Sequence, residues 1–372
     1  MNSGKSITKV CFVAPKAYPL FNPVCKEIFG GAELDLYLLA AELAKDTDFL
    51  VSFITADYGQ SEIEIIQNVK IIKGLNFRHN SLTGAHKLIK AMKKADADIY
   101  IQKSASWGTF LVAMFCRLHK RAFLYRTATA GECNGNWPRG SVERRIFQWS
   151  IRQAGKVLVQ NETDRRNIKD LLDITAILVR NGHLIQPLTQ NNRDMVLWVG
   201  RSDRLKRPEL FIDLAEQMSH EKFIMICQHA TGDNNYDTLN ARARQIKNLE
   251  FIEGVPFSEI DGFFLRAKIF VNTSDTEGFP NTFIQACKSG TPILSLNVNP
   301  DNFLNKYKCG LCADGDWQIF KNMLTDLLGT AAREYGQNAR RYVEENHNIK
   351  KIIKLYKEIF CSLIRLNADD RR

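Results

Sequence analysis

The stretch Thr273–Leu296, TSDTEGFPNTFIQACKSGTPILSL, decides how the chain is expected to fold. The apolar strand pattern Lys268–Ser274 ends in it, a helical pattern begins at Asn281, and a second strand pattern opens at Pro292. Such a turn between a strand and a helix presents backbone N–H groups and the positive end of a helix dipole, which suits a phosphate. An ordinary strand–helix–strand connection without a ligand is the open alternative.

Two side chains of this stretch are spaced to face one side of a ligand crevice. Glu277 and Gln285 lie eight positions apart, just over two helical turns. An acidic side chain beside an anion site indicates that it binds another part of the ligand, such as sugar hydroxyls. We therefore treat Glu277 as a candidate functional residue.

Strand-like apolar runs alternate with helical patterns along the whole chain. The first series includes Lys9–Pro15, a helix from Gly31 to about Ala44, and Phe49–Ala56, and a second series begins at Met195–Ser202. Strands that are apolar on both sides indicate parallel sheets covered by helices on both faces. We predict an α/β protein of two Rossmann-like, doubly wound domains in tandem, with the strand C-termini facing an interdomain cleft.

The segment 186–194, QPLTQNNRD, is polar and aperiodic and is interpreted as an interdomain linker. It separates a first domain, 1–185, from a second, 195–347. A long helical pattern in 348–372 follows the last strand, and we expect that this helix can pack back on the first domain.

Composition narrows the class of protein. The 372 residues, 45% hydrophobic and 25% charged, are enough for two globular domains, and the net charge of +10 favours anionic partners. Nucleic acid is not expected, because none of its recognised binding motifs occurs. Nine scattered cysteines lack zinc-ligand spacing and are expected to be reduced and mostly buried. No run is long enough for a membrane span and the start has no signal-peptide pattern, so we expect a cytoplasmic protein.

Two further loops are candidate phosphate sites. Gly30 and Gly31 open the helix after the first strand, where backbone can approach a phosphate closely, although a flexible turn is the alternative. The loop after the first strand of the second domain carries four cations, including Arg201 and Lys206, which fit a diphosphate. A solvated basic loop is the alternative there. The first turn lacks the full glycine fingerprint, so no nicotinamide or flavin cofactor is expected.

Two Asp-x-Asp pairs, Asp46/Asp48 and Asp96/Asp98, raise the question of a magnesium–diphosphate site. Both pairs lie between a helix end and a strand start, at the edge of the sheet opposite the predicted crevice. We therefore favour helix caps and turns, and expect no metal.

The segment Pro138–Lys156 combines four arginines with Phe147, Trp149 and Ile151. A basic amphipathic helix of this kind can lie on the inner face of an anionic membrane. We favour a helix whose apolar side packs on the sheet, and peripheral membrane contact through 138–156 stays the alternative.

Taken together, these motifs resemble the retaining glycosyltransferases of family 4, which have the GT-B fold. The resemblance covers nearly the whole chain and rests on GGAE (30–33), ILVRNGH (177–183), VGRSDRLKRPELFIDLA (199–215) and the stretch 253–296, which ends in PILSL. It implies transfer of a hexose from a nucleotide-sugar donor to a polysaccharide or lipid-linked saccharide, with the anomeric configuration retained. It does not identify the sugar.

The resemblance also implies roles for particular residues. Glu277 would contact the hexose near the reacting carbon, and Arg201 and Lys206 would stabilise charge on the departing diphosphate. No metal or other cofactor is required in such enzymes. The implied donor-binding residues are Gly30, Gly31, Gly278, Phe279, Pro280, Asn281, Thr282 and Gln285.

Three departures from the family pattern keep alternatives open. Gln285 stands where the family has a second glutamate that accepts hydrogen bonds from ribose, and Arg180 replaces a proline. Arg126, Thr127 and Glu132 lie where many members present a histidine or an acidic residue. A catalytically silent sugar-nucleotide-binding partner subunit is therefore one alternative, and another GT-B enzyme such as a sugar-nucleotide epimerase is a second.

Overall fold

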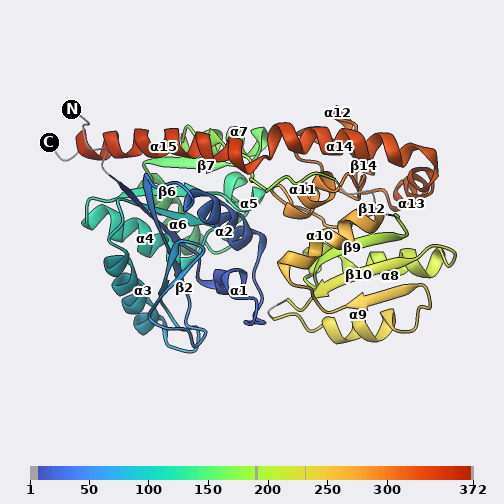
Figure 1. Cartoon of the computed structure of the whole chain (residues 1–372), viewed down its shortest axis with the longest axis horizontal. Coiled ribbons are helices and arrows are strands. Elements are labelled where there is room, and N and C mark those ends of the chain that lie inside the picture. The colour runs from blue at the N-terminus through green and yellow to red at the C-terminus, as the bar shows by residue number, and fades with distance from the viewer. Residues whose placement is uncertain (1–6, 189–191, 231, 370–372) are drawn as a thin grey trace. The chain divides into compact units, whose positions relative to one another are not determined.

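The computed structural model describes residues 7–188, 192–230 and 232–369. The chain divides into two compact units, Met1–Leu184 with Ile349–Arg372, and Ile185–Asn348 (Figure 1). The first unit therefore ends one residue before the predicted limit at 185, and the C-terminal segment belongs to it. Residues 189–191 of the predicted linker lie outside the described residues.

The first unit is built on an eight-stranded sheet with the order β3-β4-β2-β1-β5-β6-β7-β8. The expected parallel pairing is observed in every described pair except β3 with β4, which is an antiparallel edge pair. Gln67 and Asn68 join these two strands with φ of 53° and 62°. Positive φ at both turn residues makes a tight hairpin. The strands are β1 (Thr8–Val13), β2 (Phe49–Thr55), β3 (Ile63–Ile66), β4 (Val69–Lys73), β5 (Ile99–Lys103), β6 (Ala122–Arg126), β7 (Lys156–Val159) and β8 (Ile177–Leu178).

Helices cover both faces of this sheet. On one face, α3 (Ser81–Ala95), α4 (Trp107–Leu118), α6 (Ser141–Arg152) and α7 (Glu162–Leu172) form an apolar core with side chains such as Tyr100. On the other face, α2 (Gly31–Leu43) and α15 (Ile349–Asp369) pack together, and α15 also contacts β5 and β6. The remaining short helices are α1 (Tyr18–Phe21) and α5 (Ala130–Asn134).

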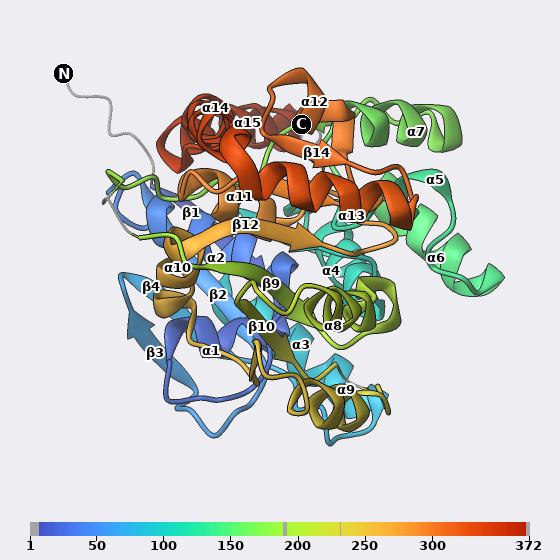
Figure 2. The same cartoon turned by 90° about the vertical axis from the view of Figure 1, so that its right-hand side faces the viewer.

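The second unit has a six-stranded sheet with the order β11-β10-β9-β12-β13-β14, parallel in every described pair (Figure 2). The strands are β9 (Met195–Arg201), β10 (Phe223–Gln228), β11 (Leu249–Ile252), β12 (Ala267–Asn272), β13 (Ile293–Ser295) and β14 (Gly310–Cys312). One apolar core lies on each face of the sheet. Helices α10 (Phe257–Arg266), α11 (Asn281–Lys288), α12 (Phe303–Lys306) and α14 (Ala332–Asn346) contribute to one, and α8 (Pro208–Gln217), α9 (Tyr236–Ala243) and α13 (Trp317–Asp326) to the other.

The Asp-x-Asp pairs are helix caps and turns, as the sequence favours. Asp96 ends α3 in a left-handed conformation and pairs with Lys9 at 3.0 Å and Arg121 at 2.6 Å. Asp46 accepts a hydrogen bond from the backbone N–H of Asp48. The described residues contain no cluster of three or more histidine, cysteine or acidic side chains arranged to hold a metal ion.

Two further predictions about packing are confirmed. Helix α6 buries Phe147 and Ile151, and the ring of Trp149 lies 5.5 Å from that of Phe110 on α4, so its apolar side packs within the unit. All nine cysteines are free thiols and seven of them are buried. Among the described helices, none combines the length and apolar character needed to cross a membrane.

Candidate functional site

The candidate site lies at the carboxyl ends of the paired strands β9 and β12. The loop after β9 contains a 3₁₀ turn, Arg204–Lys206, and the loop after β12 leads to α11. The Thr273 hydroxyl donates to the Lys206 carbonyl at 2.7 Å and accepts from the Trp198 indole N–H at 3.0 Å. Because these bonds join the second loop to the backbone of Lys206 and to β9, they fix where the Lys206 side chain begins.

Lys206 and Glu277 form an ion pair at the centre of this site. The Lys206 Nζ lies 2.7 Å from Glu277 Oε2, and the two side chains are 24% and 15% exposed. The other oxygen, Oε1, accepts from the Ser274 hydroxyl at 2.8 Å and the Asn272 amide at 3.2 Å. A carboxylate held by three donors keeps its position even when one donor moves away.

These contacts determine the charge of Glu277. Burial by itself raises the pKa of this carboxyl, but the charge of Lys206 and the hydrogen bonds from Lys206, Ser274 and Asn272 bring the pKa below its ordinary value of 4.5. Glu277 is therefore a carboxylate at neutral pH. The site contains a fixed negative group and a cation on a flexible stem, and both are within reach of solvent.

The turn before α11 is anchored from the protein core. The Phe279 ring is buried and lies 5.1 Å from Phe303 and 4.8 Å from His347, measured between ring centroids. Pro280 is the N-cap of α11 in an extended conformation, and its carbonyl accepts from the Phe283 N–H at 3.1 Å. Phe279 thus holds the N-terminus of α11 beside Glu277 through packing, and its side chain faces the core.

The structure brings some of the predicted residues together and leaves others apart. Gly278, Asn281 and Thr282 lie with Phe279 and Pro280 at the start of α11, and Gln285 is buried farther along the same helix. Arg201 pairs with Asp203 at 3.2 Å and is exposed. It is not among the described groups that contact Glu277, so the predicted trio of Arg201, Lys206 and Glu277 is observed as a pair plus a nearby surface arginine.

Gly30 and Gly31 open α2 in the first unit. Gly30 is the N-cap, and its N–H donates to the Glu33 carboxylate at 3.0 Å. Its φ of −110° is ordinary extended backbone, so this position does not need glycine for its backbone conformation. A Cβ there would lie 2.8 Å from the Glu33 carboxylate. The helix's own acid thus occupies the place where the sequence predicts a phosphate contact.

A buried ionic cluster in the first unit was not predicted from the sequence. Asp35 on α2 lies 3.0 Å from Lys103 and 2.9 Å from Arg126, which end β5 and β6. Arg126 also donates to Asn181 at 2.5 Å and to the Tyr356 hydroxyl on α15. Charged residues that end otherwise apolar strands are the signal in the sequence, but Asp35 is distant in the chain and cannot be paired with them from spacing alone.

Burial and the neighbouring charges shift the pKa values of this cluster. Burial lowers the pKa of Lys103 to about 8, partly offset by Asp35. Burial would raise the pKa of Asp35, but Arg126 and Lys103 lower it overall. The adjacent Glu132, named above as a departure from the family pattern, has its pKa raised by burial and accepts from the Tyr125 hydroxyl at 2.7 Å.

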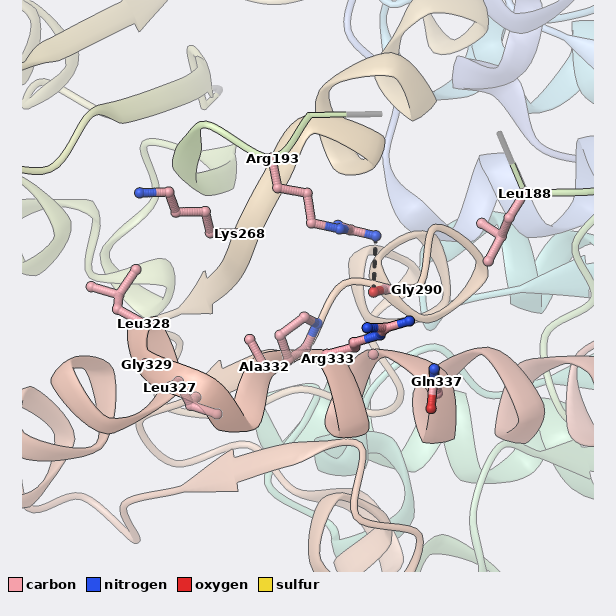
Figure 3. Close-up of a pocket in the computed structure, with 12 residues that line it drawn as sticks. Leu188, Arg193, Lys268, Gly290, Leu327, Leu328, Gly329, Ala332, Arg333 and Gln337 are labelled. Atoms are coloured by element: carbon pink, nitrogen blue, oxygen red, sulfur yellow. Dashed lines mark hydrogen bonds between the residues drawn. The ribbon is translucent and has the colours of Figure 1, made fainter. Parts of the chain in front are cut away.

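A separate pocket of about 480 Å³ lies elsewhere in the second unit (Figure 3). Lys268, at the amino end of β12, and Gly290 are among its lining residues, whereas Glu277 follows the carboxyl end of β12. The Arg193 guanidinium at its wall donates to the carbonyls of Ala267, Ser289 and Gly290 at 2.6–3.0 Å. Because this cation is committed to backbone, we assign the pocket no ligand.

Comparison with known proteins agrees with this geometry. Residues 183–355 match the family model described as glycosyl transferases group 1. This segment contains the whole second unit, with Lys206 and Glu277. A comparison with curated protein sequences finds no match.

Solved structures are similar over nearly the full chain. Sucrose-phosphate synthase from Thermosynechococcus elongatus is 16% identical with a TM-score of 0.77, covering 95% of this chain and 100% of that one. WaaG, a glycosyltransferase involved in lipopolysaccharide biosynthesis, is 14% identical with a TM-score of 0.68, covering 94% and 99%. The catalytic domain of starch synthase IV from Arabidopsis thaliana, bound to ADP and acarbose, is 9% identical with a TM-score of 0.69, covering 97% and 100%. The predicted two-domain GT-B fold is therefore confirmed.

Proposed function

We propose that this chain is a retaining glycosyltransferase of the family 4 kind, which moves a hexose from a nucleoside diphosphate sugar to a polysaccharide or lipid-linked saccharide. The observation that carries the proposal is the Lys206–Glu277 pair, at the carboxyl ends of β9 and β12 and beside the N-terminus of α11. This edge of an open parallel sheet is where such folds bind ligands. The group 1 match over residues 183–355 supports the same reaction class.

In this proposal Lys206 changes partners when the donor binds. Its Nζ turns from Glu277 to the diphosphate, where it stabilises the charge that develops as the bond to the sugar breaks. Glu277 remains in place because Ser274 and Asn272 still donate to it. Its carboxylate then accepts hydrogen bonds from hydroxyls of the hexose.

Neighbouring groups complete the donor site. The N-terminus of α11, with Gly278 and residues 279–282, faces the diphosphate, and Gln285 is assigned to the ribose. Arg201 supplies a second cation. The Gly30–Gly31 turn of the first unit is assigned separately to phosphate binding, for which the Glu33 carboxylate must move off the Gly30 N–H.

The proposed reaction is a displacement on one face of the sugar. The bond between the anomeric carbon and the leaving phosphate oxygen breaks, and the acceptor oxygen forms the new bond from the same side. The acceptor proton passes to the leaving phosphate oxygen. This scheme needs no divalent metal and no second protein carboxylate, and it leaves the anomeric configuration unchanged.

The first unit is assigned to the acceptor. We propose that the enzyme works in the cytoplasm, with peripheral contact at the inner face of the membrane through the region 138–156 where the acceptor is lipid-linked. ADP in the starch synthase structure and UDP in a TarM complex show the ligand class that proteins of this fold accept, which guides the choice of donors to test.

The test is a donor screen with the purified chain. Melting temperature is measured with UDP, ADP and GDP and with their glucose conjugates, and the anomeric configuration of any product is read by NMR. A tight donor raises the melting temperature, because a ligand of the folded state stabilises by about 2.7 kcal/mol at one hundred times its Kd. A product of inverted configuration, or no shift with any of these ligands, contradicts the proposal. A shift without turnover, unchanged in Glu277→Ala, would identify the silent binding subunit instead.

A further inference from the structure

The outward side of two packed helices, α4 and α6, is an unusually apolar and basic surface. Five large apolar side chains on it are exposed: Trp107, Met114, Leu118, Trp137 and Val142. We call this surface, together with the exposed Arg145 and Arg152, the α4–α6 face. Trp107 and Trp137 are 60% and 46% exposed, which is high for the residue type with the largest apolar side chain.

Helical periodicity places these groups on one side. On α4, Thr109, Val112 and Cys116 are buried, and Trp107, Met114 and Leu118 recur on the opposite side of the helix. The apolar row of α4 therefore points away from the sheet and toward solvent.

Helix α6 adds positive charge to the same surface. It buries Phe147, Ser150 and Ile151, so Arg145 and Arg152 lie on its outward side and are exposed. The two helices run in the same direction, because Trp107 and Trp137 flank one hollow of about 400 Å³ at their N-terminal ends and Arg117 donates to Gln153 at 2.8 Å near their C-terminal ends.

The charge of this region is strongly one-sided. Residues 104–156 contain nine lysines and arginines and two acids, Glu132 and Glu143. Arg126 and Glu132 are both buried, so eight cations and one acid, Glu143, remain at least partly exposed, and Arg121 among them pairs with Asp96 outside the region at 2.6 Å. The region therefore carries most of the net charge of +10 of the whole chain.

We propose that the α4–α6 face binds an anionic membrane surface. Tryptophan favours the depth of the lipid headgroups, and exposed arginines around an apolar row are attracted to anionic lipid. A folded protein partner is the other possible occupant, but so uniform a positive charge fits a surface of repeated negative headgroups better. The contact differs from the lone amphipathic helix of 138–156, whose apolar side is already packed against α4.

The position of the face suits the proposed function, on which this part of the inference rests. Trp107 follows the carboxyl end of β5, and Trp137 lies in the loop between α5 and α6, in the connection that follows β6. The N-terminus of α2 follows β1, which pairs with β5. The end of the face that carries Trp107 and Trp137 thus lies at the carboxyl edge of the first sheet. The saccharide headgroup of a lipid-linked acceptor held in the membrane would reach this edge.

The experiment is co-sedimentation of the full chain with extruded vesicles of phosphatidylcholine alone or with a quarter of phosphatidylglycerol. We expect binding to the anionic vesicles at low salt, and a strong decrease at high salt. Arg145→Gln/Arg152→Gln should lower the partition coefficient roughly thirtyfold, and Trp107→Ser/Trp137→Ser roughly tenfold. Brominated phosphatidylglycerol should quench the tryptophan fluorescence of the unaltered protein, and this quenching should be lost in the tryptophan variant.

Matched controls change exposed side chains elsewhere on the molecule. Val24→Ser/Ile65→Ser removes apolar side chains that are 83% and 78% exposed, and Arg244→Gln/Arg333→Gln removes two exposed arginines of the second unit. Neither should alter binding. Failure of the chain to bind anionic vesicles overturns the proposal, and so does full binding by the tryptophan variant. Donor turnover in solution is measured in parallel, so that an unaltered chain that turns over donor but does not bind anionic vesicles refutes this inference and leaves the proposed reaction standing.

Discussion

Each unit contains a lysine–carboxylate pair at the carboxyl edge of a parallel sheet, and the two pairs differ in their surroundings. In the second unit Lys206 and Glu277 are 2.7 Å apart and their side chains are 24% and 15% exposed. In the first unit Lys103 and Asp35 are 3.0 Å apart and 2% and 4% exposed, with Arg126 as a second cation. A lysine and a carboxylate therefore pair at the same edge of both sheets. We call Lys206–Glu277, which reaches solvent, the open pair, and Lys103–Asp35, which is buried, the sealed pair.

The difference shows which pair is available to a ligand. Arg126 joins the sealed pair to Tyr356 on α15, so the C-terminal helix contributes a partner to the cluster. The open pair is held by its own loops, through Ser274 and Thr273, and nothing larger than these loops covers it among its described contacts. We infer that the sealed cluster attaches α15 to the first unit, and that the open pair is the one able to exchange partners during a reaction.

The largest effect is expected from Asp35→Ala. This change leaves Lys103 and Arg126 buried without a carboxylate, and breaking a buried pair from one side costs about 3–5 kcal/mol. Urea denaturation followed by circular dichroism measures the loss. Lys103→Met is the control, since burial already lowers the pKa of Lys103 to about 8 and Asp35 keeps Arg126, so its cost should stay below about 1 kcal/mol. Equal losses from the two variants would show that the cluster is not organised around Asp35.

The next effect, on activity, is expected from Lys206→Ala. Loss of one preorganised group that stabilises the leaving charge typically lowers turnover by about 10²–10³. The second unit offers a close match in Lys268→Ala, because Lys268 lies 2.7 Å from Glu221 with exposures of 34% and 15% at the amino end of β12. The two variants should lose similar stability, about 1 kcal/mol or less, while Lys268→Ala keeps full kcat. A parallel fall in kcat for both would remove Lys206 from the reaction.

The same contrast explains what can be predicted from the sequence. Alternating strand and helix patterns predict both sheets, and the turn from Glu277 to Asn281 predicts the open site, because these signals lie within a few residues of one another. Asp35, Arg126 and Tyr356 are far apart in the chain and meet only in the folded unit, so no local spacing in the sequence predicts their contact. The β3–β4 hairpin was missed because Gln67 and Asn68 are not the residues most typical of its turn. The pairing of Arg201 with Asp203 was missed because side-chain direction in a loop is not encoded by spacing.

A smaller effect should come from Tyr356→Phe, which tests whether the sealed cluster holds α15. The change removes a hydroxyl that accepts from Arg126 and keeps the ring, which lies 5.7 Å from Phe360. A hydrogen bond to a charged group contributes about 1.5–3 kcal/mol. Faster hydrogen exchange in α15, with α14 unchanged, is the expected signature. Uniform acceleration over the whole chain would instead assign the effect to general destabilisation.

The smallest effect concerns pH and distinguishes the two carboxylates. The pKa of Glu277 lies below 4.5, so the stability that its ionised form contributes is present above about pH 4.5 and is lost as the pH falls through the lower, folded value. In Lys206→Met the cation is gone while burial still raises the pKa, so the acid limb of kcat/KM and of stability should move to higher pH. Lys103→Met should move the acid limb of stability less, because Arg126, the stronger of the two charges acting on Asp35, remains beside it. An unshifted acid limb in Lys206→Met would mean that Ser274 and Asn272 alone hold Glu277 ionised, and that Lys206 is not needed to keep the open site charged.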